Sequence, residues 1–183
     1  MTNYVYIAQS LDGYIAGKNG ETDWLEAIEN PEKSDFGFAD FMQNIDAIVM
    51  GRNTFEKVLS FGEWVYDKPV FVASSSLTNL PKGLKEGVFL LKGTPSQMVK
   101  TLRDRGYENL YIDGGKLICS CLAEGLIDTM IITTVPILLG DGFPLFGLLP
   151  KKIKLKMINC EILSDQLIKT TYDVEKGLKW RVF

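Results

Sequence analysis

The stretch AIVMGRNT at residues 47–54 decides the fold of this chain, and LYIDGGKL at residues 110–117 has the same pattern. Each runs from an apolar segment, typical of a strand buried on both faces, through a glycine turn into a helix start. Backbone N–H groups at such a turn can approach a phosphate closely. For either turn alone, an ordinary strand-to-helix connection without a ligand is an equal alternative. Two of them in 183 residues, the first with Arg52, predict a cofactor with more than one phosphate.

Strand and helix patterns alternate along the rest of the chain. Thr94, Pro95 and Gln97 form a capping box that starts a helix, and Gly106 ends it. Alternating apolar and polar residues after residue 150 predict an antiparallel hairpin with its turn near residues 163–165. We therefore expect one domain over residues 1–183, a mostly parallel twisted sheet with helices on both faces and a C-terminal antiparallel hairpin. The predicted strands cover residues 4–9, 47–50, 69–73, 109–112, 129–135, 153–157 and 166–175.

The composition excludes several classes of function. The chain is 46% hydrophobic and 23% charged, with a net charge of −3, so it lacks the excess of Lys and Arg that a nucleic-acid or acidic-membrane surface needs. No apolar run approaches the roughly 20 residues of a membrane span. The N-terminus has no basic segment before its apolar stretch, so we expect no signal peptide and a cytoplasmic location.

Histidine is absent, which excludes a Ser-His-Asp triad, a Cys-His pair and any histidine metal ligand. A proton needed near neutral pH must then come from a carboxylate, Tyr, Lys, Cys or water. Cys119, Cys121 and Cys160 lack the spacing of zinc or redox motifs, so we expect buried structural thiols and no metal site.

The residues around the two glycine turns are the candidates for phosphate binding. Gly51 permits close approach of the backbone, and Arg52 offers a planar fork of donors. Thr54 can cap a helix over residues 55–59. Gly114-Gly115 places a helix start beside a strand end, although neither a Rossmann fingerprint nor a Walker A loop is present. The serines at 74–76 end another strand and could bind a phosphate, with a solvated loop as the alternative.

Aromatic residues gather between residues 24 and 41, among several acidic side chains. This concentration could line a pocket for a flat heterocycle, but we favour core packing of a helix around residues 38–43 for most of them. The aromatic residues are Trp24, Phe36, Phe38 and Phe41.

Taken in order, these motifs resemble dihydrofolate reductase. The segments that carry the likeness are IA at 7–8, LDGYIA at 11–16, DW at 23–24, VMGRNTFE at 49–56, VASS at 72–75 and IDGG at 112–115. SLDG at 10–13 and PILLGDG at 136–142 resemble more closely a relative of that enzyme, the reductase domain of bacterial riboflavin biosynthesis (the RibD C-terminal domain). The resemblance covers residues 4–175.

The resemblance implies NADPH as the cofactor and hydride transfer to a small, pyrimidine- or pterin-like compound. One candidate substrate is 5-amino-6-(5-phosphoribosylamino)uracil of riboflavin biosynthesis. Ala8 matches the backbone position beside the nicotinamide. Arg52, Ser74 and Ser75 match positions near the 2′-phosphate. The remaining implied positions are Gly51, Asn53 and Thr54 on the adenosine side, and Gly114, Gly115, Lys116 and Leu117 at the pyrophosphate.

The substrate side departs from the resemblance at several positions. Asp23 replaces the proline of the Pro-Trp motif of dihydrofolate reductases, and the spacing of their catalytic acid matches Glu29. Tyr6 stands where riboflavin-type reductases usually carry a lysine. Asp113 replaces their glutamate before the glycine pair. We take Trp24 and Glu29 as candidates for substrate binding and Asp113 as the candidate catalytic acid; the alternative is that Asp113 only caps the helix beginning at Gly114.

Two other functions remain open at this point, a true dihydrofolate reductase and a nucleotide-binding sensor without chemistry. We also expect a homodimer, because the hairpin carries apolar residues that a chain of this size leaves uncovered, and open sheet edges favour pairing with a second copy. The resemblance also implies association through this region. The apolar residues in question are Ile153, Leu155, Met157 and Leu167.

Overall fold

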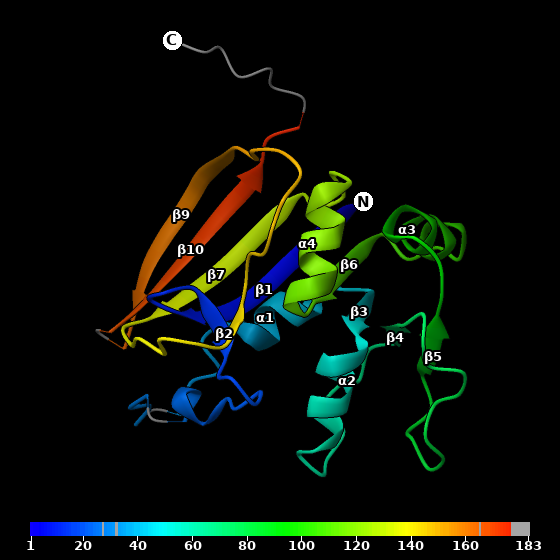
Figure 1. The fold of residues 1–183 in the computed structure, drawn as a ribbon, viewed down its shortest axis with the longest axis horizontal. Helices are drawn as coiled ribbons and strands as arrows, with labels where there is room; N and C mark the ends of the chain where they lie inside the picture. Colours follow the sequence, from blue (N-terminus) through cyan, green and yellow to red (C-terminus); the bar gives the residue numbers. More distant parts are fainter. Residues whose placement is uncertain (27, 32, 165, 177–183) are drawn as a thin grey trace.

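The computed structural model describes residues 1–26, 28–31, 33–164 and 166–176. They form an eight-stranded sheet in the order β5-β4-β3-β6-β1-β7-β10-β9 (Figure 1). The strands are β1 (Thr2–Ser10), β3 (Ala47–Gly51), β4 (Val70–Ala73), β5 (Val88–Leu91), β6 (Asn109–Asp113), β7 (Thr129–Val135), β9 (Leu155–Leu163) and β10 (Leu167–Val174). A separate two-stranded sheet pairs β2 (Tyr14–Ala16) with β8 (Phe143–Pro144).

The pairing confirms the predicted architecture. The strands from β1 to β7 in the large sheet pair in parallel, and β10 pairs antiparallel with β7 and with β9. The apolar segment at 47–50 is at most 3% exposed, because β3 lies between β4 and β6 with helices on both faces. Strand β5 was not predicted; its side chains follow no clear alternation, and Phe89 is exposed at the sheet edge.

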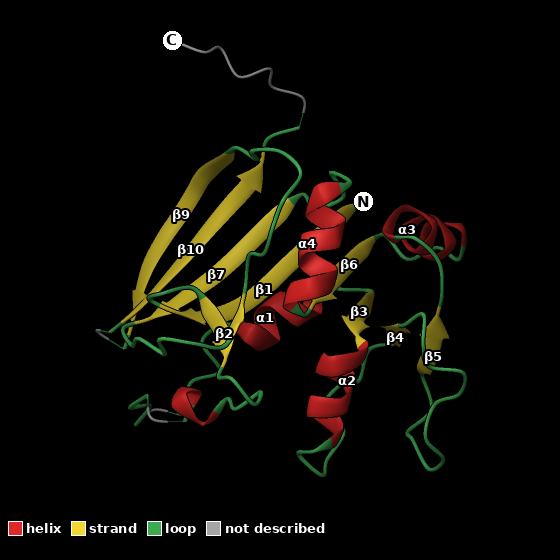
Figure 2. Ribbon diagram, in the orientation of Figure 1, coloured by secondary structure: helices red, strands yellow, loops and turns green. Residues whose placement is uncertain are grey.

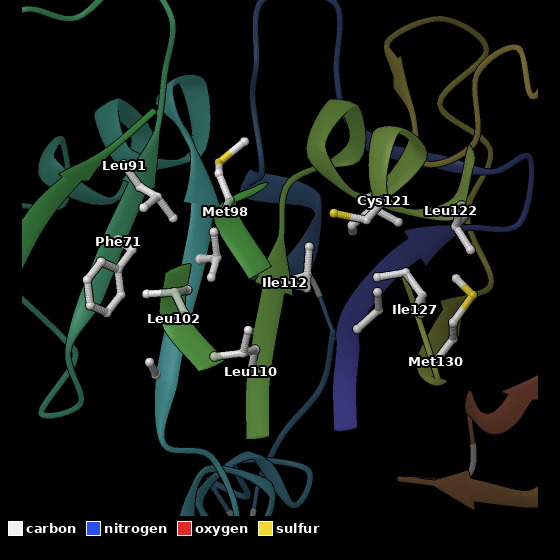
Figure 3. Close-up of a cluster of buried hydrophobic side chains, with 14 of the residues drawn as sticks. Phe71, Leu91, Met98, Leu102, Leu110, Ile112, Cys121, Leu122, Ile127 and Met130 are labelled. Atoms are coloured by element: carbon white, nitrogen blue, oxygen red, sulfur yellow. The ribbon is translucent and has the colours of Figure 1, made fainter. Parts of the chain in front are cut away.

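Helices pack on both faces of the sheet (Figure 2). The helices are α1 (Phe38–Gln43), α2 (Arg52–Leu59), α3 (Pro95–Asp104) and α4 (Gly115–Ala123). α3 and α4 pack through residues such as Leu102, Ile118 and Cys121 against one face, which we call the α4 face (Figure 3). α1 and α2 pack through Phe41 and Phe55 against the other, which we call the α1 face. No helix in the described ranges is long and apolar enough to cross a membrane.

The predicted helix starts are right at α3 and wrong at α2. At α3, Thr94 Oγ1 accepts a hydrogen bond from the Gln97 amide at 3.3 Å, and Gln97 Oε1 accepts one from the Thr94 amide at 2.9 Å. At α2, the helix begins at Arg52 because Gly51, in an extended conformation, already acts as the N-cap. Thr54 therefore lies in the first turn and does not cap a helix over residues 55–59.

The hairpin is present, and of the four apolar residues predicted to be uncovered only Met157 is exposed. Leu167 is 1% exposed because it packs with Trp24 and Val135, and Ile153 and Leu155 pack against the main core. Asp165, placed in the predicted turn, lies outside the described residues. The residues that do expose apolar surface on β9 and β10 are Met157 (62%), Ile158 (51%), Ile162 (72%) and Ile168 (48%).

The expectation of three buried thiols holds for one cysteine. Cys121 is 2% exposed, and burial raises the pKa of its thiol to about 12. Cys119 is partly exposed, and its Sγ donates to the Leu145 carbonyl at 3.4 Å. Cys160 is exposed, because it lies on β9, the edge strand of the sheet.

Candidate functional site

The two glycine turns of the sequence lie side by side. β3 and β6 are neighbours in the sheet, with Met50 paired to Asp113, so both strands end at the same edge. The helix after β3 covers the α1 face and the helix after β6 covers the α4 face. In an open α/β sheet, ligands usually bind where such a change occurs, outside the carboxyl ends of the strands, and we call this place the crevice.

Contact between the two turns requires glycine at residue 114. Gly114 has φ +96°, a conformation that L side chains rarely adopt, and a Cβ there would collide with Thr54 Oγ1. The same Cβ would lie 3.8 Å from the Gly51 amide nitrogen. On the other side, a Cβ at Gly51 would lie 4.0 Å from Leu117 Cβ. Four of the predicted cofactor residues therefore form one surface of backbone and short side chains.

The starts of α2 and α4 present backbone N–H groups without side-chain caps. Their N-cap residues are Gly51 and Gly114, and neither helix has a side-chain cap hydrogen bond. Helix starts of this kind carry partial positive charge and unpaired donors, which suit an anionic group. Asp113 is not the cap of α4, so that alternative is wrong: Gly114 occupies the cap position, and the helix begins at Gly115.

The polar candidates surround these helix starts. Arg52 is exposed, and its Nε lies 3.8 Å from Glu56 Oε1 one turn along α2. Gly51 pairs with Ala73, so Ser74 and Ser75 follow β4 beside the same turn. Ser74 Oγ already accepts the Leu77 amide at 3.0 Å. Ser75, Asn53 and Lys116 are exposed.

Two loops close the other side of the crevice, and Asp12 holds them together. Its carboxylate accepts the Gly140 amide at 2.8 Å, the Leu139 amide at 3.2 Å and the Ser10 hydroxyl at 2.6 Å. The Ser10 hydrogen bond, together with the two amides, holds the pKa of Asp12 below its usual range. A Cβ at Gly115 would lie 3.1 Å from Ile15 Cδ1. The SLDG and PILLGDG motifs thus build one structure beside α4, a role that sequence reasoning did not assign to Asp12.

Asp113 lies among tyrosines on the α1 face. Burial raises the pKa of its carboxyl from 3.8 to about 6, although a hydrogen bond from the Gly114 amide opposes the shift. Burial and the charge of Asp113 also raise the pKa of Tyr66. A carboxyl with this pKa can hold or release a proton near neutral pH. Sequence reasoning missed both tyrosines, because Tyr111 has the pattern of an ordinary strand residue and Tyr66 belongs to no motif.

Tyr111 and Tyr6 are joined by a hydrogen bond where β1 and β6 separate. β1 and β6 pair over three residue pairs, the last being Tyr4 with Tyr111, although both strands run further. The Tyr111 hydroxyl donates to the Tyr6 carbonyl at 2.9 Å, and the Tyr6 hydroxyl donates to the Phe36 carbonyl at 2.9 Å. Burial, followed by the charge of Asp35, raises the pKa of Tyr6 to about 12, so its hydroxyl stays protonated.

Two of the aromatic candidates pack in the core, as the sequence favoured, whereas Trp24 has a buried donor without a partner among the described residues. Phe38 and Phe41 pack in the core, and the Phe41 ring stacks on Tyr6 with 4.7 Å between centroids. Trp24, in a single 3₁₀ turn (Asp23–Leu25), is 7% exposed, and its Nε1 has no hydrogen-bond partner among the described residues. A buried donor of this kind favours an oxygen acceptor nearby, from a ligand or from water. Glu29 is exposed and lies outside any helix, so no helix fixes the position of its carboxylate.

A hollow of about 150 Å³ lies on the opposite side of the sheet. Ala8 and Gln9 are successive residues of β1, so their side chains point to opposite faces. The hollow is therefore separated by the sheet from Ala8 and Asp113. Its lining residues are Gln9, Ile132, Thr134, Phe146, Leu155, Thr170 and Tyr172.

Comparison with known proteins identifies the family of the chain. The family model of the RibD C-terminal domain matches residues 4–169. The uncharacterized protein YwjB of Bacillus subtilis is 35% identical over 156 residues, which cover 84% of this chain and 87% of YwjB. The structure of a putative riboflavin biosynthesis protein from Shewanella sp. PV-4 is 48% identical, with a TM-score of 0.93 over 96% of this chain and 100% of that one.

More distant structures share the fold. A diaminohydroxyphosphoribosylaminopyrimidine deaminase/5-amino-6-(5-phosphoribosylamino)uracil reductase from Thermotoga maritima is 16% identical, with a TM-score of 0.73 over 94% of this chain and 56% of its own. Dihydrofolate reductase from Enterococcus faecalis, complexed with NADP(H), is 19% identical, with a TM-score of 0.64 over 96% of this chain and 97% of its own. The chain therefore has a dihydrofolate reductase-like fold and belongs to the RibD C-terminal domain family.

Proposed function

We propose that this protein is an NADPH-dependent reductase that transfers hydride to a small heterocyclic compound. The observation that carries the proposal is the pair of uncapped helix starts in contact at Gly51 and Gly114, with Arg52 beside them. Family membership supports an oxidoreductase, and a dihydrofolate reductase of the same fold is complexed with NADP(H).

The residues present fit such a cofactor. Gly114 must be glycine for the two turns to meet, which leaves backbone donors facing the crevice for a pyrophosphate. Arg52 with Ser74 and Ser75 would hold the 2′-phosphate, and the backbone at Ala8 would lie beside the nicotinamide. When bound, the cofactor supplies the hydride. The residues proposed for the pyrophosphate are Gly114, Gly115, Lys116 and Leu117.

Asp113 is the proposed proton donor. Its raised pKa, about 6, keeps a fraction of the carboxyl protonated near neutral pH, and its strand ends beside the crevice. Burial raises the pKa values of Tyr111 and Tyr66, and both lie close enough to the carboxyl for its charge to raise them further; Trp24 offers a buried N–H to an oxygen of the substrate. The first compound to assay is 5-amino-6-(5-phosphoribosylamino)uracil, which the Thermotoga relative is named for reducing.

Selectivity for NADPH over NADH tests the cofactor assignment. The two differ only in the 2′-phosphate, to which Arg52 can donate two parallel hydrogen bonds. The Arg52 side chain is 47% exposed, so solvent screening should limit the gain to about tenfold in affinity. Arg52→Ala should weaken NADPH about tenfold and leave NADH nearly unchanged, as followed by cofactor fluorescence.

The matched control is Arg105→Ala. Arg105 is also exposed but stacks over the Phe71 ring, 5.8 Å from its centroid. Its replacement should leave both affinities unchanged. Arg52→Lys should recover part of the lost affinity, because a point charge cannot reproduce the fork. Equal affinity of the wild type for the two cofactors would contradict the role of Arg52. Failure of the wild type to bind either cofactor would contradict the reductase.

The exposed apolar side chains of β9 and β10 support a further proposal, that the protein is a homodimer. Ile162 and Ile168 are cross-strand neighbours, 72% and 48% exposed, and Met157 and Ile158 extend the patch along β9. Patches of this kind on an edge strand favour association, and a second copy offers the same patch in reverse.

A further inference from the structure

A row of polar side chains crosses the α1 face beside Ala8. The strand registers pair Ala8 with Thr133, Thr133 with Lys169, and Lys169 with Glu161. Cross-strand neighbours share a face, so these four residues lie in line from β1 to β9. Lys169 is two strands from Ala8, which corresponds to roughly 10 Å between their backbones. The row lies next to the place proposed for the nicotinamide.

Lys169 is held in this row by contacts that it shares with Tyr6, whose carbonyl accepts the Tyr111 hydroxyl. Its Nζ donates to the Phe36 carbonyl at 3.3 Å and lies 3.2 Å from Glu161 Oε2. The Phe36 carbonyl is also the acceptor of the Tyr6 hydroxyl at 2.9 Å, so the ammonium and the phenol share one oxygen. The Lys169 side chain is 14% exposed, whereas that of Glu161 is 42% exposed. The cation is thus nearly buried on the same face as Asp113.

The contacts of Lys169 leave one of its donors for a ligand. An ammonium has three N–H groups, and the described residues supply two acceptors, the Phe36 carbonyl and Glu161. Gly37, at φ +87°, lets the ammonium lie close to the turn, since a Cβ there would lie only 3.3 Å from Lys169 Nζ. Phe36 itself has φ +55°, a conformation unusual for a residue with a side chain, so the contacts of its carbonyl hold a strained turn.

The charges near Lys169 decide which group it can bind. Glu161 forms an ion pair with it, and the charge of Lys169 contributes to the lowered pKa of Asp35, so a second carboxylate is also close. A negatively charged group of a ligand would meet both carboxylates. A neutral carbonyl oxygen meets no such repulsion and can accept the third N–H.

We propose that Lys169 binds a neutral ring carbonyl oxygen of the substrate and so selects heterocycles that carry a carbonyl at this position of the ring. This inference deepens the proposed reductase function and rests on it, because the bound heterocycle is a substrate only if the protein is a reductase. Lys169 binds the carbonyl at one end of the ring, two strands away from Ala8, and Asp113 lies on the same face. Because the ammonium is positioned by Glu161 and Phe36 before a ligand arrives, it needs no rearrangement to bind one.

The direct test is the ¹⁵Nζ resonance of Lys169, recorded by NMR on protein labelled with ¹³C,¹⁵N-lysine and assigned by its absence in Lys169→Arg. Uracil and quinazoline-2,4-dione carry ring carbonyls; pyrimidine and quinazoline are the same rings without them. The first pair should shift the Lys169 resonance and the second pair should not. Orotate, which adds a carboxylate to uracil, should shift it less than uracil does.

Lys154 is the matched control within the same spectrum. It also pairs with a glutamate, Glu175, at 3.1 Å, but lies at the opposite end of the hairpin and is 48% exposed. Its resonance should stay unchanged with every compound. A Lys169 resonance that neither carbonyl compound moves would overturn the inference. A larger shift with orotate than with uracil would also overturn it, in favour of an anion site.

Variants separate direct binding from support of the Phe36 turn. Lys169→Met should weaken uracil about tenfold or more and leave pyrimidine unchanged, as expected for loss of a hydrogen bond from a charged donor. Lys169→Arg, which keeps the charge, should retain part of the preference. Tyr6→Phe removes the other donor to the Phe36 carbonyl and should keep the preference for uracil over pyrimidine. If Tyr6→Phe abolishes that preference as Lys169→Met does, Lys169 only supports the turn.

The two proposals fail in different ways. A wild-type protein that binds NADPH but shows no response of Lys169 keeps the reductase proposal and loses the carbonyl site. A protein that binds no NADPH, but whose Lys169 responds to uracil, loses the reductase proposal and keeps the site.

Discussion

Replacement of Asp113 by asparagine should stabilise the protein at neutral pH while it removes activity. The pKa of Asp113 is raised from 3.8 to about 6 by burial, so ionisation of this carboxyl opposes folding. At 1.36 kcal/mol for each unit of pKa shift, the shift of roughly two units corresponds to about 3 kcal/mol of stability. The asparagine side chain cannot ionise but keeps an oxygen for the Gly114 amide. We therefore expect Asp113→Asn to unfold at higher urea concentration than the wild type at pH 7.5.

The sign of the pH dependence follows from proton uptake. Well below the ordinary pKa of 3.8, Asp113 is protonated in both states, so the stabilities of the wild type and the variant should converge toward low pH. Between about pH 4 and pH 6 the unfolded chain releases the proton first, so the stability of the wild type falls as pH rises. Well above pH 6 both states are largely ionised, and the difference levels off near 3 kcal/mol. Urea unfolding at pH 4, 5, 6 and 7.5 measures this curve.

Asp35→Asn is a control of opposite sign. The Asp35 carboxylate accepts the Ala39 amide at 2.7 Å and the Gly37 amide at 2.9 Å, which lowers its pKa. Asp35 therefore contributes stability above its ordinary pKa, and this contribution is lost as pH falls. The variant should be less stable than the wild type at pH 7.5, with the gap narrowing toward low pH.

Turnover provides the second readout for Asp113→Asn. Loss of a general acid should lower kcat about 10²-fold or more. The decline of wild-type kcat above pH 6 should also disappear in the variant. A stability difference that stays constant from pH 4 to pH 7.5 would refute the burial argument. An unchanged kcat would refute the catalytic role.

Four further substitutions test the fold, the crevice and the assembly. Asn3 is 5% exposed; its Nδ2 donates to the Leu126 carbonyl at 2.6 Å, and its Oδ1 accepts a hydrogen bond from Arg103 Nη2 at 2.5 Å. Asn3→Leu should therefore lower the free energy of unfolding in urea by about 2–4 kcal/mol, and a change below about 1 kcal/mol would contradict the importance of these hydrogen bonds. Gly114→Ala should lower the melting temperature and abolish cofactor binding. Adding Thr54→Ala to this variant should partly restore the melting temperature, because it removes the hydroxyl with which the new Cβ collides. Ile162→Glu should convert a dimer to a 20.5 kDa monomer in sedimentation at micromolar concentration; a wild type that is already monomeric contradicts the dimer.

Local sequence patterns predicted most of the fold. The capping box at Thr94, the apolar segment at 47–50 and the alternation in the hairpin each depend on residues close together in the chain, whose hydrogen bonds and periodicity act over a few residues. The weakly patterned β5 was missed for the same reason. Thr54 was misassigned because Gly51, without a side chain, can also occupy the N-cap position of a helix.

The candidate site depends on strand order, which local patterns do not reveal. The sequence by itself determined two strand-turn-helix units, the glycines that let them approach closely, and the absence of histidine chemistry. Only the tertiary structure decided that β3 and β6 are neighbours, that burial raises the pKa of Asp113, and that Lys169 shares an acceptor with Tyr6. The reason is physical: a carboxyl's pKa and an ammonium's partners depend on desolvation and on groups far apart in the chain, which meet only when the sheet is assembled.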